Sequence, residues 1–192
     1  MLSDLQRIGV KVACADPSFP ALELVPVFHR WIQSAALPGH MLIDVADYDH
    51  VPEGPGILLV AHEANLALDE VGGRVGLLYY RKQPLDGDLP ARLRAAVTTA
   101  LQACRLLEQD AALGGRLRFN AGSFELFAND RLNAPNQAAT YDAFQPTLDT
   151  LLRALYGDGK CTVARPADAR SRFGVTVDGP QTSVDQALAR LG

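Results

Sequence analysis

Three polar clusters in this sequence contain residue types that could carry chemistry. The first is His62-Glu63, at the junction of two expected strands. An imidazole titrates near neutral pH and a neighbouring carboxylate can fix its tautomer, so the pair could serve acid–base catalysis or metal binding. The spacing is unfavourable, because Leu66 stands where a metalloprotease helix has its second histidine. Adjacent strand residues also point to opposite faces, which favours a hydrogen-bonded histidine at a strand end.

The second cluster is the polar loop from Asn129 to Asn136. Arg131 could bind an anionic or amide-bearing ligand, with Asp130 orienting the guanidinium. Internal turns and capping of the next helix by Asn136 would use the same groups without a ligand, and we favour this second interpretation. The candidate ligand-binding residues of the two clusters are His62, Glu63, Asn129, Asp130, Arg131 and Asn133.

The third cluster is acidic and consists of Asp44, Asp47, Asp49 and His50. Oxygen-rich loops can hold Mg²⁺ or Ca²⁺, but the alternating acidic spacing of a calcium loop and its distal glutamate are missing. Aspartates are also ordinary turn residues because their side chains bond to the nearby backbone. A solvated turn is the simpler interpretation.

The cysteines and glycines add no recognisable site. Cys14, Cys104 and Cys161 are odd in number and far apart, which fits neither a disulfide framework nor structural zinc, so we expect reduced thiols. Neither the Walker A pattern nor G-x-G-x-x-G is present, and Ser123 lacks a G-x-S-x-G turn. We therefore predict no metal and no cofactor.

Hydrophobic periodicity predicts the elements that position these clusters. Alternating or continuous apolar runs predict strands at 10–15, 41–45, 57–61, 65–70, 75–81, 161–165 and 173–177. Gly72-Gly73 predicts a two-residue hairpin turn, and a second hairpin is predicted from strands 116–119 and 124–127 around 120–122. Apolar stripes at helical spacing predict helices at 26–37, 89–111 and 148–156, with Pro146 separating the last from a weak turn at 138–144. Ser183 and Gln186 predict a capping box that begins a terminal helix.

Paired strands interrupted by helices, without regular alternation, predict the α+β class. We expect a mixed, mainly antiparallel sheet with helices packed over it in two layers. The 192 residues show no shift in composition and no repeat, so we expect a single domain over residues 1–192.

Composition and charge narrow the functional classes. With 48% hydrophobic residues the chain can bury a continuous core, while its longest apolar runs are too short to cross a membrane. A net charge of −4 and a pI near 5.5, without a basic run, argue against nucleic acid as partner. The N-terminus shows no secretory signal, which predicts a cytoplasmic protein.

Four stretches resemble a bacterial protein family of unknown function: LVPVFHRWIQ at 24–33, LIDVADY at 42–48, GLLYYRK at 76–82 and NDRLNAPN at 129–136. The resemblance covers roughly residues 10 to 156. It implies a stand-alone bacterial protein and carries over no catalytic residue.

Two functions follow as hypotheses. The first is a non-catalytic domain that binds an unknown small molecule or protein, and this hypothesis leaves open that the chain forms a homodimer. The second is a small-molecule enzyme whose polar site combines His62, Glu63, Asp130 and Arg131. Convergence of these four side chains on one concave pocket would favour the enzyme.

Overall fold

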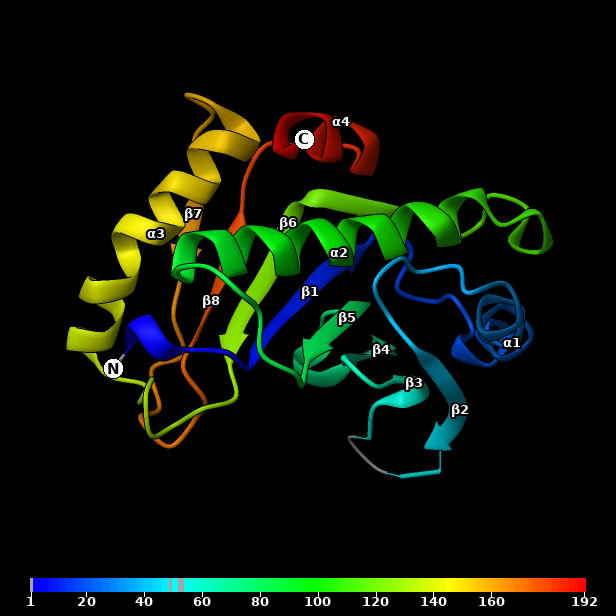
Figure 1. The fold of residues 1–192 in the computed structure, drawn as a ribbon. Helices are drawn as coiled ribbons and strands as arrows, with labels where there is room; N and C mark the ends of the chain where they lie inside the picture. Colours follow the sequence, from blue (N-terminus) through cyan, green and yellow to red (C-terminus); the bar gives the residue numbers. More distant parts are fainter. Residues whose placement is uncertain (1, 49, 52–53) are drawn as a thin grey trace.

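The chain builds one antiparallel sheet with helices on one of its faces (Figure 1). The computed structural model describes residues 2–48, 50–51 and 54–192. In this part of the chain the eight strands run in the order β2-β3-β4-β5-β1-β6-β8-β7, and each neighbouring pair is antiparallel. Their bounds are β1 Ile8–Cys14, β2 Leu42–Tyr48, β3 Gly56–Ala61, β4 Ala64–Asp69, β5 Gly76–Arg81, β6 Phe119–Ala128, β7 Thr162–Ala164 and β8 Gly174–Asp178. The predicted α+β class is confirmed.

The helices are α1 Leu24–Ser34, α2 Leu89–Gln109, α3 Ala138–Tyr156 and α4 Val184–Leu191. Figure 1 shows α2 running across the sheet, α1 near β2, α3 on the opposite side of the molecule and α4 above α2. The predicted capping box is present, because the Ser183 hydroxyl accepts from the Gln186 N–H while the Gln186 side chain accepts from the Ser183 N–H. None of the described helices combines the length and apolar character of a membrane span.

Strand alternation separates the two faces of the sheet. Val10 pairs with Tyr79 and Leu126, and all three are buried under the helices in the hydrophobic core. The next row along the strands faces the other way, and there Lys11 pairs with Leu78 and Glu125. This second face, which we call the helix-free face, is only partly exposed.

The predicted second hairpin is wrong, because residues 119–128 form the single strand β6. Phe124 pairs with Val12 but Asn120 pairs with Ala13, so the residues between them form a bulge. Gly122 is required there for close approach: an added Cβ would lie 2.0 Å from the Pro180 carbonyl oxygen. Gly122 therefore marks a close approach between two backbone segments and not a turn.

The predicted break at Pro146 is also wrong, since α3 runs through it. Proline removes one backbone hydrogen bond from a helix. Here the apolar stripe continues on both sides, with Phe144, Leu148, Leu151 and Leu155 all buried. Burial of this stripe outweighs the lost bond, which a local propensity argument cannot weigh.

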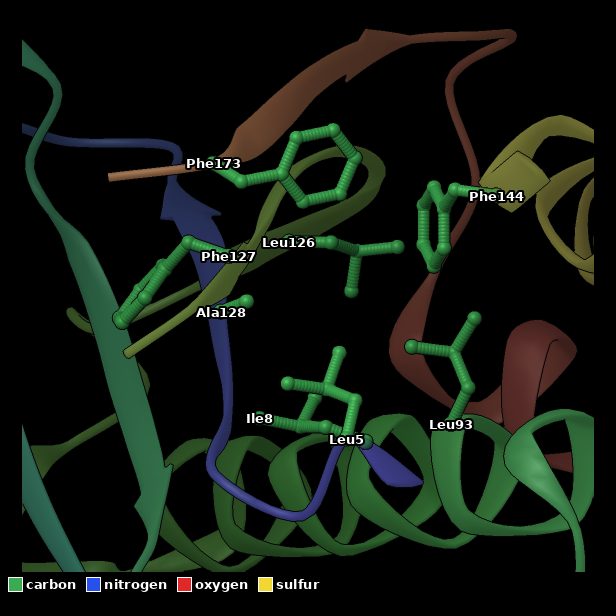
Figure 2. A pocket seen from close by; sticks show the side chains of 8 residues that line it. All are labelled: Leu5, Ile8, Leu93, Leu126, Phe127, Ala128, Phe144 and Phe173. Atoms are coloured by element: carbon green, nitrogen blue, oxygen red, sulfur yellow. The ribbon is translucent and has the colours of Figure 1, made fainter. Parts of the chain in front are cut away.

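A small gap remains between the layers and is shown in Figure 2. Its volume is about 10 Å³, and its walls are apolar, with Leu126, Phe144 and Phe173 facing one another. The ring of Phe127 points away from it, toward the helix-free face. A space of this size holds no more than a single water, so it is a packing gap and no ligand site.

Candidate functional site

His62 and Glu63 form the turn between β3 and β4, where Glu63 serves the backbone. Its Oε2 accepts a 2.7 Å hydrogen bond from the Met41 N–H, and its carbonyl accepts from the Lys82 N–H at 2.9 Å. Partial burial works to raise the pKa of Glu63, but the Met41 N–H and the nearby histidines outweigh it, so this pKa is lowered. The His62 side chain is exposed.

A hydrogen-bonded chain that the sequence analysis missed lies beside this turn. His40 Nε2 is 3.0 Å from the Tyr79 hydroxyl, and Arg81 Nη1 is 3.4 Å from the same hydroxyl. The Pro38 carbonyl can only accept, so His40 Nδ1 carries the proton and donates to it at 3.1 Å. In the neutral imidazole Nε2 is then the acceptor, and the Tyr79 hydroxyl donates to it. We call these three side chains the corner chain.

The corner chain is closed within the protein. Arg81 is buried and also donates to the backbone carbonyls of Gln83 and Pro84. Burial lowers the pKa of His40, and the Arg81 charge adds to this effect against the opposing Pro38 carbonyl and Glu63. The corner chain thus favours the neutral form of the half-buried His40 imidazole, and the bond from His40 to Pro38 orders the loop that leads into β2.

The loop from Asn129 to Asn136 is largely satisfied by its own groups. Asp130 accepts from both the N–H and the side chain of Asn133, at 3.1 and 2.8 Å. Asn136 is buried and donates to two carbonyls in the segment before β8, so it does not cap α3 as expected. Asn129 donates to the Tyr80 hydroxyl at 3.0 Å. Arg131 is exposed, and its charge contributes to lowering the pKa of Asp168, behind the bonds that Asp168 receives from Arg170.

The four residues of the enzyme hypothesis belong to two separate places. The His62-Glu63 turn precedes β4, whereas Asp130 and Arg131 follow β6, and β5 and β1 lie between these strands. Three strand spacings amount to about 14 Å. The described hydrogen bonds join Glu63 to Met41 and Asp130 to Asn133, and none of them joins the two places.

The centre of the helix-free face is closed by its own side chains. Lys11 Nζ lies 2.5 Å from Asp69 Oδ2 and 2.8 Å from the Val71 carbonyl, and both charged residues are buried. The Arg172 guanidinium covers the ring of Phe127 at 3.5 Å. A partner would therefore meet satisfied groups at this centre.

The free edge of the sheet at β2 is different. Seven large hydrophobic side chains of the described residues are exposed, and Met41, Ile43, Tyr48 and Val51 lie on β2 or within three residues of its ends. β2 pairs with β3 and has no second neighbour among the described strands. The opposite edge strand, β7, has only three residues. We call residues 41–48 the β2 edge.

The metal candidates gain no support in the described part of the chain. No three of its histidine, cysteine, aspartate and glutamate side chains are placed to hold a metal ion. Asp44 and Asp47 lie on β2 rather than in the expected turn, and Asp49 lies outside the described residues. Cys104 is buried in the core, and burial raises the pKa of its thiol, while Cys14 and Cys161 are free and partly exposed.

The fold defines an α+β protein with one antiparallel sheet and an uncovered long edge strand. Searches among family models, curated proteins and solved structures find no match to this chain. The resemblance seen in the sequence stays an expectation.

Proposed function

We propose that this chain is a binding domain that holds a partner protein along the β2 edge. The observation that carries the proposal is the gathering of exposed apolar side chains there: Met41 is 65% and Ile43 54% exposed. Large apolar groups clustered at a solvent-facing site are typical of protein-binding surfaces. A long strand with one unpaired side can also accept another strand, because its backbone groups offer a row of donors and acceptors.

The placement of the other polar groups supports the same choice. The corner chain and the Glu63 carboxylate both fix the start of β2, through the loop at Pro38 and through the Met41 N–H. These groups position the β2 edge instead of presenting reactive atoms to a substrate. The chemistry predicted for Glu63 is replaced by a structural role in this proposal.

Site-specific photo-crosslinking in cells tests the proposal. A photoreactive amino acid at Ile43 should give a discrete adduct with another protein, since this side chain points into solvent at the edge. The matched control is the same photoreactive amino acid at Asp142, which is exposed on α3, at the end of the sheet opposite to β2. Adducts that are equally strong at both positions, or absent at Ile43, would refute binding at this edge.

A further inference from the structure

The charge of the chain is unevenly distributed along the sequence. Residues 31–73, which include β2, β3 and β4, contain seven of the 22 acidic residues and none of the 18 lysines and arginines. One of the seven, Asp69, is paired with Lys11 from β1. Residues 31–73 therefore contribute no lysine or arginine to the β2 end of the sheet, and Asp44 and Asp47 lie on the edge strand itself.

The β2 edge also contains its own cap. The Val45 N–H donates to Asp44 Oδ1 at 2.8 Å, and the Asp44 side chain is exposed. The pairing with β3 shifts register between Leu42 and Asp44, so Ile43 forms a bulge. Charges and bulges on edge strands prevent indiscriminate strand pairing. A neutral strand would have to compete with the Asp44 carboxylate for the Val45 N–H.

We propose that the β2 edge takes an extended segment in which apolar residues alternate with lysine or arginine, and that this segment adds a strand to the sheet. A cationic side chain would pair with the Asp44 carboxylate and draw it from the Val45 N–H, so the same contact supplies attraction and opens the cap. Alternate apolar side chains of the segment would lie beside Ile43 and Met41. This inference rests on the proposed function and adds the chemistry of the partner.

A second copy of the chain fits the edge less well. Pairing β2 with itself would bring together two strands that each carry Asp44 and Asp47. Like charges on neighbouring strands are destabilising, and the two exposed Asp44 carboxylates would meet without a lysine or arginine from residues 31–73. A basic segment turns the same charges into an attraction.

The test uses three synthetic seven-residue peptides, matched to the length of β2. One alternates valine and lysine, one alternates valine and glutamate, and the third is the lysine peptide N-methylated on alternate amides so that strand pairing is blocked. Binding is measured by fluorescence anisotropy on the full chain, and the site is read from the β2 amide signals in NMR spectra. The lysine peptide should bind at least about tenfold more tightly than the other two.

Matched variants separate the β2 edge from general attraction. Asp44→Asn with Asp47→Asn should weaken the lysine peptide about five- to tenfold. The control, Asp142→Asn with Asp149→Asn, changes the net charge equally on exposed positions of α3 and should leave affinity unchanged.

Each result has one meaning. If lysine and glutamate peptides bind β2 equally, the charge inference fails while strand binding at the edge stands. If the N-methylated peptide binds as well as its parent, or both double variants weaken binding equally, the attraction is general and the strand mechanism is wrong. If no peptide shifts the β2 signals and crosslinking at Ile43 also fails, the proposed function falls. Sedimentation velocity would show a dimer that forms with rising concentration if a second copy of the chain binds the β2 edge. If the formation of this dimer also shifts the β2 amide signals, the occupant is a second copy and not a basic segment.

Discussion

Replacing Lys11 by methionine tests whether the centre of the helix-free face is closed. The side chains of Lys11 and Asp69 are only 4% and 9% exposed, and their charged atoms are 2.5 Å apart. Methionine keeps most of the volume and leaves the Asp69 carboxylate buried without its counter-charge. Removing one partner of such a pair costs about 3–5 kcal/mol, a large part of the roughly 5–15 kcal/mol that stabilises a typical domain.

Urea denaturation at pH 7 measures this cost as a change in the free energy of unfolding. Asp69→Asn should lower stability similarly, and the double variant should lose at least about 2 kcal/mol less than the two single losses together, because it strands no charge. The control is Glu23→Gln in the exposed pair of Glu23 with Arg116, whose side chains are 39% and 53% exposed. Its loss should stay below about 1 kcal/mol.

A loss below about 1 kcal/mol for Lys11→Met would refute the reasoning. Such a result would mean that water reaches Asp69 freely, as it reaches Glu23. The centre of the helix-free face would then be an open polar surface, and placing the partner at the β2 edge would lose one of its supports.

Three further predictions concern single positions. Gly9→Ala should cost about 1–3 kcal/mol in urea denaturation, because its Cβ would lie 2.1 Å from the Phe127 ring; an unchanged midpoint would contradict this packing. Burial lowers the pKa of His40, so as pH falls the unfolded chain binds a proton at this imidazole before the folded chain does, and the stability of the wild type should fall as pH drops below about 6.5. His40→Asn should flatten this loss of stability in thermal melts from pH 7 to 5. An unaltered slope would assign the loss of stability to another group. Arg131→Ala should change the free energy of unfolding by less than about 0.5 kcal/mol, since this side chain is exposed. Asp130→Ala should cost about 1 kcal/mol, because Asp130 loses two hydrogen bonds from Asn133. Thermal melts in which Arg131→Ala is the more damaging of the two would contradict the contacts of this loop.

Local patterns predicted most elements of the fold. The hairpin between β4 and β5 and the positive φ values of Gly72 and Gly73 agree with the prediction, but its two-residue turn is wrong, because residues 70–75 separate the last strand pair, Asp69 and Gly76. The failures at Gly122 and Pro146 have a common physical cause. Each residue has a strong local preference that a distant contact overrides: the approach of Pro180 in one case and burial of the α3 stripe in the other.

The site was harder to predict than the fold. Glu63 was singled out for its neighbour His62, but its partners are Met41 and the corner chain, which lie elsewhere in the sequence. His40 and Tyr79 are 39 positions apart, and no spacing rule joins them. The one available signal was an arginine at the end of an otherwise apolar strand, Arg81, because a buried guanidinium must find acceptors.

The two edges of the sheet show opposite solutions to the same physical problem. β7 pairs with β8 and, being three residues long, offers too short a free side to hold a further strand. β2 keeps seven residues and exposed apolar groups, and relies on a bulge at Ile43 and on the Asp44 carboxylate over the Val45 N–H. Shortness limits the pairing of a further strand permanently, whereas a carboxylate cap can be withdrawn by a cation. An edge that is protected only in this reversible way retains the capacity to pair, and the absence of lysine and arginine from residues 31–73 means that the cation must come from a partner or from another part of the chain.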